Sequence, residues 1–180
     1  RELELGEDHD GIIELPDDAP VGTPFPAYAG LDDPVIDVSI TPNRQDCMGV
    51  RGIARDLAAA GYGTLKPLAM PEVAGTGAGP DVRVEDADGC PAFYAQAVRG
   101  LTNGEAPEWM RRRLAAIGQK PISTLVDITN YVMFDLGRPL HVYDMARLNG
   151  GLVARRAVSG ERVVALNGKS YTLDGGETVI

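Results

Sequence analysis

ISTLVDITNYVMFDLGRPLHVYD, residues 122–144, is the stretch that decides the fold. Apolar residues recur at helical spacing in its first half, which predicts an amphipathic helix. Its expected buried stripe consists of Leu125, Ile128, Val132 and Leu136. Thr124 followed by Asp127 predicts a capping box at the start of this helix. We expect the helix to end at Gly137 in a left-handed turn, because Pro139 prevents its continuation.

Polar side chains lie within this predicted helix and again shortly after it. Thr129 and Asn130 fall in mid-helix, where both residue types are mediocre helix formers and no periodicity requires them. The turn at residues 137–139 then returns His141 to the neighbourhood of the helix. A hydroxyl, a carboxamide and an imidazole brought together could hold a small polar substrate and a water. The alternative, which the spacing alone favours, is that Thr129 and Asn130 cap local backbone and that His141 is structural.

Composition sets the class of protein that surrounds this stretch. The 180 residues are 44% hydrophobic and 24% charged, as in an ordinary soluble globular protein, and no apolar run approaches the roughly 18 residues of a membrane span. The net charge of −9 argues against binding nucleic acid by bulk electrostatics, although local contacts with RNA stay open. Cys47 and Cys90 are isolated, so we expect neither a zinc site nor a disulfide framework, and a reducing cytoplasm fits best. We also expect a piece of a longer protein, because the chain begins at Arg1 without a Met.

The fold class expected from the whole pattern is α+β, in two small units. The Pro- and Gly-rich residues 67–80 have little to bury and predict a linker between a unit at 1–66 and a second unit at 81–180. The second unit is expected to be an incomplete domain with a mixed sheet. We expect strands and helices in both units, at 11–15, 35–40, 81–85, 92–99, 151–157, 161–166, 169–173 and 177–180 for the strands, and at 47–60 and 107–117 for the helices.

Several local signals fix the ends and faces of these elements. Asp46 is the expected N-cap of the first helix, and Pro107 suits the first turn of the second. Asn167-Gly168 predicts a hairpin, and the strand at 177–180 is expected to present an unpaired edge. The second helix is expected to bury Met110, Leu114 and Ile117.

Basic side chains and one histidine have two interpretations each. The run Arg111–Arg113 could contact RNA phosphates or form a solvated surface. Arg44, Arg51 and Arg55 could likewise form a solvated face or contact an acidic partner. His9 lies among acids that are more typical of a solvated loop than of a metal site.

Several common enzyme classes have no sequence signature in this chain. There is no GxxxxGK[ST] phosphate loop, no GxSxG elbow and no pair of histidines for a catalytic zinc. What survives is a hydrolytic or binding pocket built from neutral polar groups.

Two long motifs resemble one family. VIDVSITPNRQDCMGVRGIARDLAA, at 35–59, is similar to the segment that follows the tRNA-binding OB-fold insertion in bacterial phenylalanyl-tRNA synthetase beta subunits. STLVDITNYVMFDLGRPLHVYDMARLNGGLVAR, at 123–155, resembles the editing domain of the same subunit. The resemblance covers most of the chain, from about residue 8 to residue 180, and two such motifs in the family's order are far more specific than a short pattern.

The resemblance implies a place in an α2β2 ligase that attaches phenylalanine to tRNA(Phe) with ATP and Mg²⁺. The adenylating centre belongs to the alpha subunit, so no cofactor or metal is expected in this chain. The beta subunit hydrolyses mischarged tyrosyl-tRNA(Phe), and the matching pocket residues here are Thr129, Asn130 and His141. The family's remaining pocket residues fall after residue 180, so we expect an incomplete, inactive pocket. The resemblance also implies a cytoplasmic enzyme with no membrane partner.

Two other functions stay open beside editing. The chain could be a non-catalytic scaffold that braces the alpha–beta interface and positions tRNA, a role that suits residues 1–66. It could also come from a free-standing editing-like protein, although such a protein would not need the motif at 35–59. For His141 we expect help in placing water or ester, not an obligatory role as general base.

Overall fold

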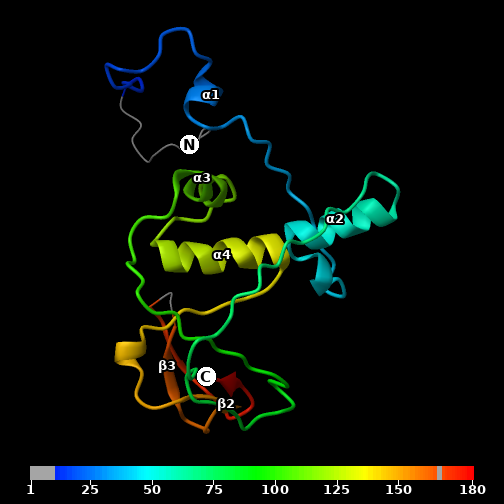
Figure 1. The fold of residues 1–180 in the computed structure, drawn as a ribbon, viewed down its shortest axis with the longest axis vertical. Coiled ribbons are helices and arrows are strands. Elements are labelled where there is room, and N and C mark those ends of the chain that lie inside the picture. Colours follow the sequence, from blue (N-terminus) through cyan, green and yellow to red (C-terminus); the bar gives the residue numbers. More distant parts are fainter. Residues whose placement is uncertain (1–10, 166–167) are drawn as a thin grey trace.

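Helix α4 (Thr124–Leu136) lies at the centre of the fold, with α3 (Glu108–Ala116) along one side and α2 (Val50–Ala59) at its C-terminal end (Figure 1). The structure is a computed structural model that describes residues 11–165 and 168–180. The other elements are α1 (Phe25–Tyr28), the 3₁₀ helices η1 (Gln45–Cys47) and η2 (Met145–Arg147), and the strands β1 (Val82–Val84), β2 (Leu152–Arg156), β3 (Arg162–Val164), β4 (Ser170–Thr172) and β5 (Thr178–Val179).

The predicted end of α4 is confirmed, and its predicted capping box is wrong. Gly137 adopts the left-handed conformation, with φ 69°, and its N–H donates to the Met133 carbonyl at 2.8 Å. The N-cap is Ser123, which makes no side-chain capping hydrogen bond. The Asp127 carboxylate instead accepts from the backbone N–H of Ile122 at 2.8 Å, so the acid stabilises the residue before the cap.

The buried face of α4 differs from the predicted stripe. Ile128 and Leu136 are 40% and 38% exposed. The face toward α3 carries Asp127, which is only 1% exposed, together with Tyr131 and Phe134. These residues lie at helical spacing as well, and the position of α3 decides which of two partly apolar faces is covered. The core that they pack against consists of Ala106, Met110 and Leu114.

Helix α3 follows its sequence signals closely. It begins directly after Pro107, which takes the N-cap position, and it buries Met110 and Leu114 as predicted. Ile117 is 44% exposed, because the helix has already ended at the preceding residue. Its predicted burial is therefore wrong.

Two small sheets form the part of the fold that lies below α4 in Figure 1. Strand β2 pairs in parallel with β1 and antiparallel with β5. The C-terminal strand is therefore the last of this sheet, and its other side pairs with no described strand, as the predicted unpaired edge requires. Strands β3 and β4 form the expected antiparallel hairpin. Asn167 of its predicted turn lies outside the described residues, as do Leu166 and His9.

Three predicted strands are wrong. Residues 11–15, 35–40 and 92–99 form no strand in the structure, because no described segment pairs with their backbones. Val35, Ile36 and Val38 are accordingly exposed. Alternation of apolar residues suggests a strand, but a strand needs a partner at hydrogen-bonding distance.

The first predicted long helix is shorter than expected. Asp46 belongs to η1, so it is not an N-cap; α2 begins after Gly49 and ends at Ala59. Its apolar residues Val50 and Leu57 are 63% and 51% exposed.

The architecture as a whole is mixed, with small mixed sheets compatible with α+β. Residues 66–80 contain no helix or strand, and α2 of the first predicted unit contacts α4 of the second. The division into two units stays a prediction.

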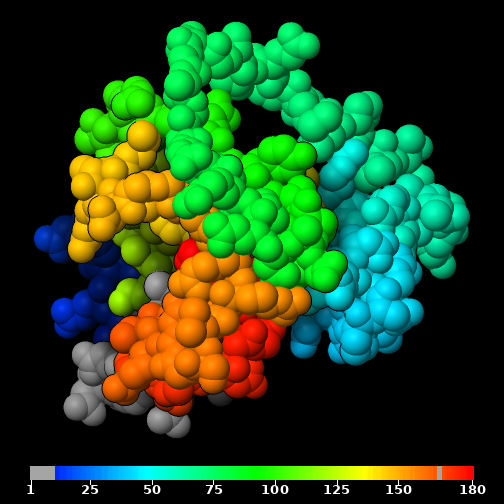
Figure 2. Space-filling model, turned by 90° about the horizontal axis from the view of Figure 1, so that it is seen from below, coloured from blue at the N-terminus to red at the C-terminus, as the bar shows by residue number. Residues whose placement is uncertain are grey.

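The solvent-accessible surface area of the chain is 14803 Å², whereas a compact monomer of this size would expose about 8,400 Å². In the space-filling view the cyan α2 region stands to one side of the orange and red strands (Figure 2).

Candidate functional site

Helix α4 carries two of the three predicted pocket residues. The Thr129 hydroxyl donates to the Val126 carbonyl at 2.7 Å, which is the backbone-capping arrangement, but its oxygen keeps acceptor capacity. Asn130 is half-buried beside it. His141 is exposed in the segment after α4, with its ring 6.1 Å from that of Tyr143. Within the described residues no hydrogen bond joins His141 to Thr129 or Asn130, so the pocket stays a prediction.

An aromatic contact and a hydrogen bond with α3 fix the orientation of α4. The rings of Trp109 and Tyr131 meet edge to face with centroids 5.2 Å apart. Arg113 places its guanidinium 5.7 Å from the Trp109 ring centroid and donates to the Tyr131 hydroxyl at 2.8 Å. Because Tyr131 directly follows Asn130, these contacts restrain the part of the helix that carries the candidate residues. No motif or periodicity in the sequence indicates this cluster, because its members lie on two helices that meet only in the fold.

The three consecutive arginines of α3 all have partners on the chain itself. Arg111 contacts Glu105 at 3.0 Å and Glu108 at 2.7 Å, and Arg112 contacts Glu108 at 2.9 Å. These two cations lower the pKa of the Glu108 carboxyl through hydrogen bonds, from Arg111 above all. The run is therefore not a free cationic surface, and nothing in its geometry favours the RNA interpretation.

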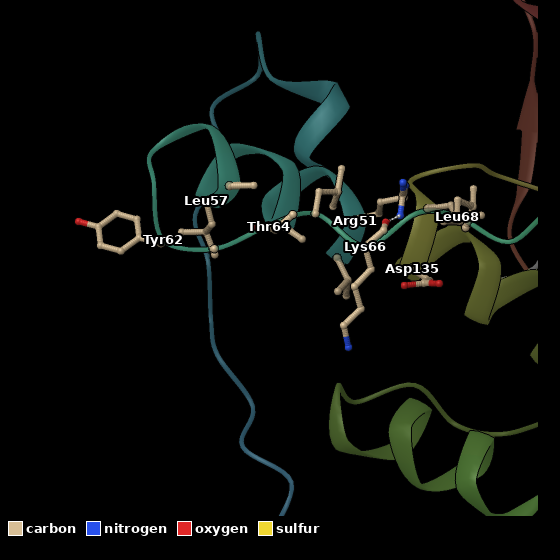
Figure 3. A pocket seen from close by; sticks show the side chains of 13 residues that line it. Arg51, Leu57, Tyr62, Thr64, Lys66, Leu68 and Asp135 are labelled. Carbon is tan, nitrogen blue, oxygen red and sulfur yellow. Dashed lines mark hydrogen bonds between the residues drawn. The ribbon is translucent and has the colours of Figure 1, made fainter.

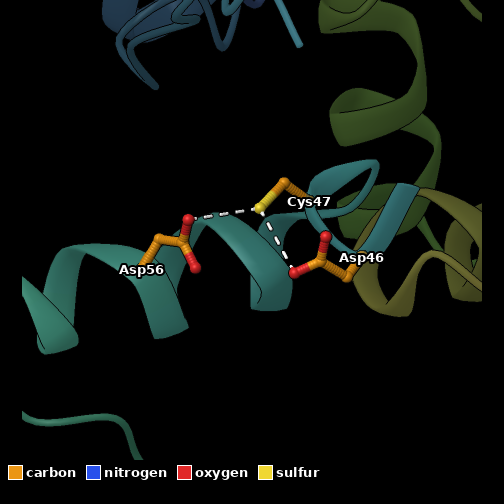
Figure 4. Close-up of side chains that lie close together, drawn as sticks. All are labelled: Asp46, Cys47 and Asp56. Atoms are coloured by element: carbon orange, nitrogen blue, oxygen red, sulfur yellow. Dashed lines mark hydrogen bonds between the residues drawn. The ribbon is translucent and has the colours of Figure 1, made fainter. Parts of the chain in front are cut away.

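A second cluster of ionisable groups joins η1 to α2 (Figure 4). Arg44 Nη2 lies 3.0 Å from an Asp46 carboxylate oxygen and 2.6 Å from an Asp56 oxygen, and Arg55 also pairs with Asp46. The hydrogen bond from Arg44 is the largest cause that lowers the pKa of Asp46, to about 2, and it lowers that of Asp56 as well. The Cys47 thiol lies between the two acids, and burial raises its pKa. Arg44 and Arg55 therefore pair with acids of this chain, while their side chains stay 40% and 48% exposed.

The same cluster offers three potential metal ligands, but its charges argue against an ion. One ligand atom each of Asp46, Cys47 and Asp56 lies within 4.8 Å of the others. Arg44 and Arg55 already neutralise both carboxylates, and a metal would also need the thiolate, which burial disfavours. We interpret the cluster as the structural connection between η1 and α2.

A surface cavity of about 360 Å³ lies between α2 and the end of α4 (Figure 3). Its walls are mainly apolar, with Arg51, Lys66 and Asp135 as the charged residues. The Arg51 guanidinium donates to the backbone carbonyl of Lys66 at 3.1 Å, and this hydrogen bond fastens the segment after α2 to the helix. None of the three predicted pocket residues is among those that line this cavity.

Comparison with known proteins assigns this part of the chain to a family. The B3/4 domain family matches residues 89–180, a span that includes α3, α4, His141 and the strands from β2 onward. The chain belongs to the B3/4 domain family.

Over its whole length the chain is also similar to one subunit of a tRNA ligase. It is 62% identical over 181 aligned residues to the phenylalanine–tRNA ligase beta subunit of Zymomonas mobilis, covering 100% of the chain and 23% of that relative. Identity to the same subunit of Novosphingobium aromaticivorans is 61%, with the same coverage. For Rhodopseudomonas palustris it is 56%, over 99% of the chain and 22% of the relative. These matches confirm the resemblance seen in the two motifs, and the chain spans less than a quarter of the length of these curated relatives.

No described helix is both long and apolar enough to cross a lipid bilayer.

Proposed function

We propose that this chain is part of a phenylalanine–tRNA ligase beta subunit and contributes to a site that hydrolyses mischarged tyrosyl-tRNA(Phe). The observation that carries the proposal is the B3/4 match, which encloses Thr129, Asn130 and His141, within a chain similar to that subunit from end to end. The partners are then an alpha subunit, in an α2β2 cytoplasmic enzyme, and tRNA(Phe). ATP and Mg²⁺ serve the alpha subunit's adenylating centre, and this chain's own residues require neither.

The side chains of α4 suit ester hydrolysis without a strong nucleophile. An aminoacyl ester is already activated, so the reaction needs a positioned water and a hydrogen-bond donor near the developing oxyanion. The Asn130 carboxamide supplies both a donor and an acceptor, and Thr129 supplies acceptor lone pairs. The exposed His141 has the freedom to orient water or the ester. We assign it that assisting role.

Discrimination between tyrosine and phenylalanine follows from one hydroxyl. A pocket that hydrogen-bonds this group rejects the analogue lacking it by roughly 10⁴-fold, since its buried polar groups would otherwise stay unpaired. The residues that contact the hydroxyl lie outside the candidate set of this chain.

A scaffold that positions tRNA or the alpha subunit is the second candidate function. The ion-paired connection between η1 and α2, and the contact of α2 with α4, favour a bracing role for residues 41–66. The two functions are compatible, because one segment can brace the other.

The proposal is tested in the two-subunit enzyme with Asn130→Ala. We expect hydrolysis of tyrosyl-tRNA(Phe) to fall by about 100-fold, the scale of losing one oxyanion donor, while charging with phenylalanine is unchanged. Asn149→Ala, at an exposed asparagine of the same domain, is the matched control and should hydrolyse normally. Intact hydrolysis with Asn130→Ala would instead assign the chain to the scaffold function.

A further inference from the structure

We propose that Gly49 is a positioning residue for the turn that carries His141, an inference that rests on the proposed editing function. The backbone before α2 crosses the backbone after α4 at Gly49 and Gly137, two glycines that belong to the two separate sequence motifs. This crossing makes the motif at 35–59 part of the machinery that sets the geometry of the motif at 123–155.

The contact at the crossing leaves no room for a side chain on Gly49. A β-carbon there would lie 2.4 Å from the Gly137 nitrogen, 3.0 Å from the Gly137 α-carbon and 3.0 Å from the Leu136 carbonyl carbon. All three atoms are backbone, which cannot swing aside as a flexible side chain would. Gly49 itself has φ −162° and ψ 157°, an extended conformation open to any residue. The close approach, not the backbone conformation, therefore requires glycine at this position.

At position 137 the backbone conformation, and not a close contact, requires glycine. Its φ of 69° is the left-handed conformation that ends α4, and this favours glycine. A β-carbon there would lie 3.7 Å from the Met48 carbonyl carbon, which is ordinary van der Waals contact. Substitutions at the two glycines can thus separate the crossing from the turn conformation.

The segment that delivers Gly49 to the crossing is held firmly. The Gly49 carbonyl accepts from Ile53 N–H at 3.2 Å as the first bond of α2. Arg44 joins η1 to the middle of α2 through Asp56, at 2.6 Å. A β-carbon on Gly52 would lie 1.9 Å from the Asp46 carbonyl oxygen, so η1 rests directly on the helix backbone. The crossing has little freedom to relax on this side.

The side of the crossing that can be displaced is consequently the turn after α4. Only Arg138, Pro139 and Leu140 separate Gly137 from His141, and the proline ring restricts one backbone dihedral of that link. A displacement at Gly137 is therefore carried toward His141. A misplacement of about 1 Å can cost roughly 100-fold in rate without a lost contact to the substrate.

The test uses Gly49→Ala in the two-subunit enzyme, with two independent measurements. We expect kcat for tyrosyl-tRNA(Phe) hydrolysis to fall by roughly 10- to 100-fold, with KM within about twofold because tRNA binding is spread over many contacts. Hydrogen–deuterium exchange should become faster in peptides that cover residues 137–144 and stay unchanged in those that cover 107–118. Charging with phenylalanine should be normal. Gly77→Ala is the control, since a β-carbon there meets nothing within 4 Å.

Two substitutions at Gly137 are compared, one of which preserves the left-handed turn conformation. Gly137→Asn tolerates the left-handed conformation and should retain most hydrolysis, whereas Gly137→Ala should lose more. Unchanged exchange at 137–144 in Gly49→Ala would overturn the positioning role, whatever Asn130→Ala does. Normal hydrolysis in Gly49→Ala, in an enzyme that Asn130→Ala inactivates, would also overturn it. Failure of Gly49→Ala to assemble would contradict it too, because the crossing would then hold the whole fold instead of one turn.

Discussion

Arg113 donates from Nη1 to the phenolic oxygen of Tyr131 at 2.8 Å, and this bond joins α3 to the residue next to Asn130. The same guanidinium lies over Trp109, whose ring meets the Tyr131 ring edge to face. Together with the packing of Phe134 against the core at Met110 and Leu114, these three residues restrain rotation of α4 about its axis.

Loss of the Tyr131 hydroxyl should cost little, and its cost should depend on Arg113. We expect Tyr131→Phe to lower the free energy of unfolding by about 0.5–1 kcal/mol, because the bond is exposed to water. The Tyr131→Phe/Arg113→Ala double variant should be less destabilised than the sum of the two single variants. Urea unfolding followed by fluorescence of Trp109, the single tryptophan of the 180 residues, measures this coupling. Strict additivity would show that the bond contributes nothing.

The buried Asp127 should tolerate an amide far better than an alanine. Its carboxylate accepts from Ile122 N–H at 2.8 Å, and the residue is 1% exposed. Asp127→Ala should lower the free energy of unfolding by about 1–3 kcal/mol, because it leaves that N–H without its partner. Asp127→Asn keeps an acceptor and should cost less than half as much. Thermal unfolding compares them, with the exposed Asp33→Ala as control; equal losses for both Asp127 variants would disprove a role as acceptor.

Acid should loosen the sheet that Asp86 holds together. The Thr178 hydroxyl donates to Asp86 at 2.7 Å, and this bond is the main cause that holds the Asp86 pKa below its ordinary 3.8. Gly89 N–H and Arg156 lower it further. A lowered pKa in the folded state gives stability that is present above pH 3.8 and lost as pH falls through the folded-state value.

Removal of the Thr178 hydroxyl provides the test of that pH dependence. Thr178→Val keeps the shape of the side chain but raises the Asp86 pKa toward its ordinary value, so acid unfolding should begin at a higher pH. Circular dichroism during an acid titration measures the midpoint, and Thr172→Val, on the exposed β4, is the control. The same midpoint for Thr178→Val and the parent chain would refute the assignment.

Cys47 should react more slowly than Cys90. Cys47 is 4% exposed, and its pKa is raised by burial and by its hydrogen bond to Asp56, whereas Cys90 is half-buried. Because the thiolate is the nucleophile, iodoacetamide at pH near 8 should label Cys90 first. Mass spectrometry of the modified peptides follows both rates, which should converge in urea. Faster labelling of Cys47 would contradict the buried, neutral thiol.

Sequence predicted those helix ends that a glycine or a proline marks, and it failed at the N-caps of α2 and α4 and at the buried face of α4. Gly137 and Pro107 act through local backbone conformation, so their signals needed no tertiary information. The buried face of α4 depends on where α3 lies, and Ile128 was assigned to the core because periodicity alone cannot choose between two partly apolar faces.

The pairing of strands that are distant in sequence could not be predicted from the sequence either. Residues 35–40 and 92–99 alternate as strands do, but no described segment pairs with them. The candidate pocket residues came from the resemblance to a family, since their spacing favoured a structural role. The crossing brings together Gly49 and Gly137, which are 88 positions apart in the sequence. The local sequence around either glycine does not indicate a contact with the other.

The hydrogen bond between Asp86 and Thr178 spans 92 residues, and this separation sets an order in time. On a ribosome that adds about 5–20 residues per second, β1 would wait roughly 5–20 s for the strand that completes its sheet. Helices α3 and α4 are close in sequence and can meet long before that. During synthesis the helical pair would therefore be in place first, and the growing chain would carry an unfinished sheet edge while these 92 residues are added.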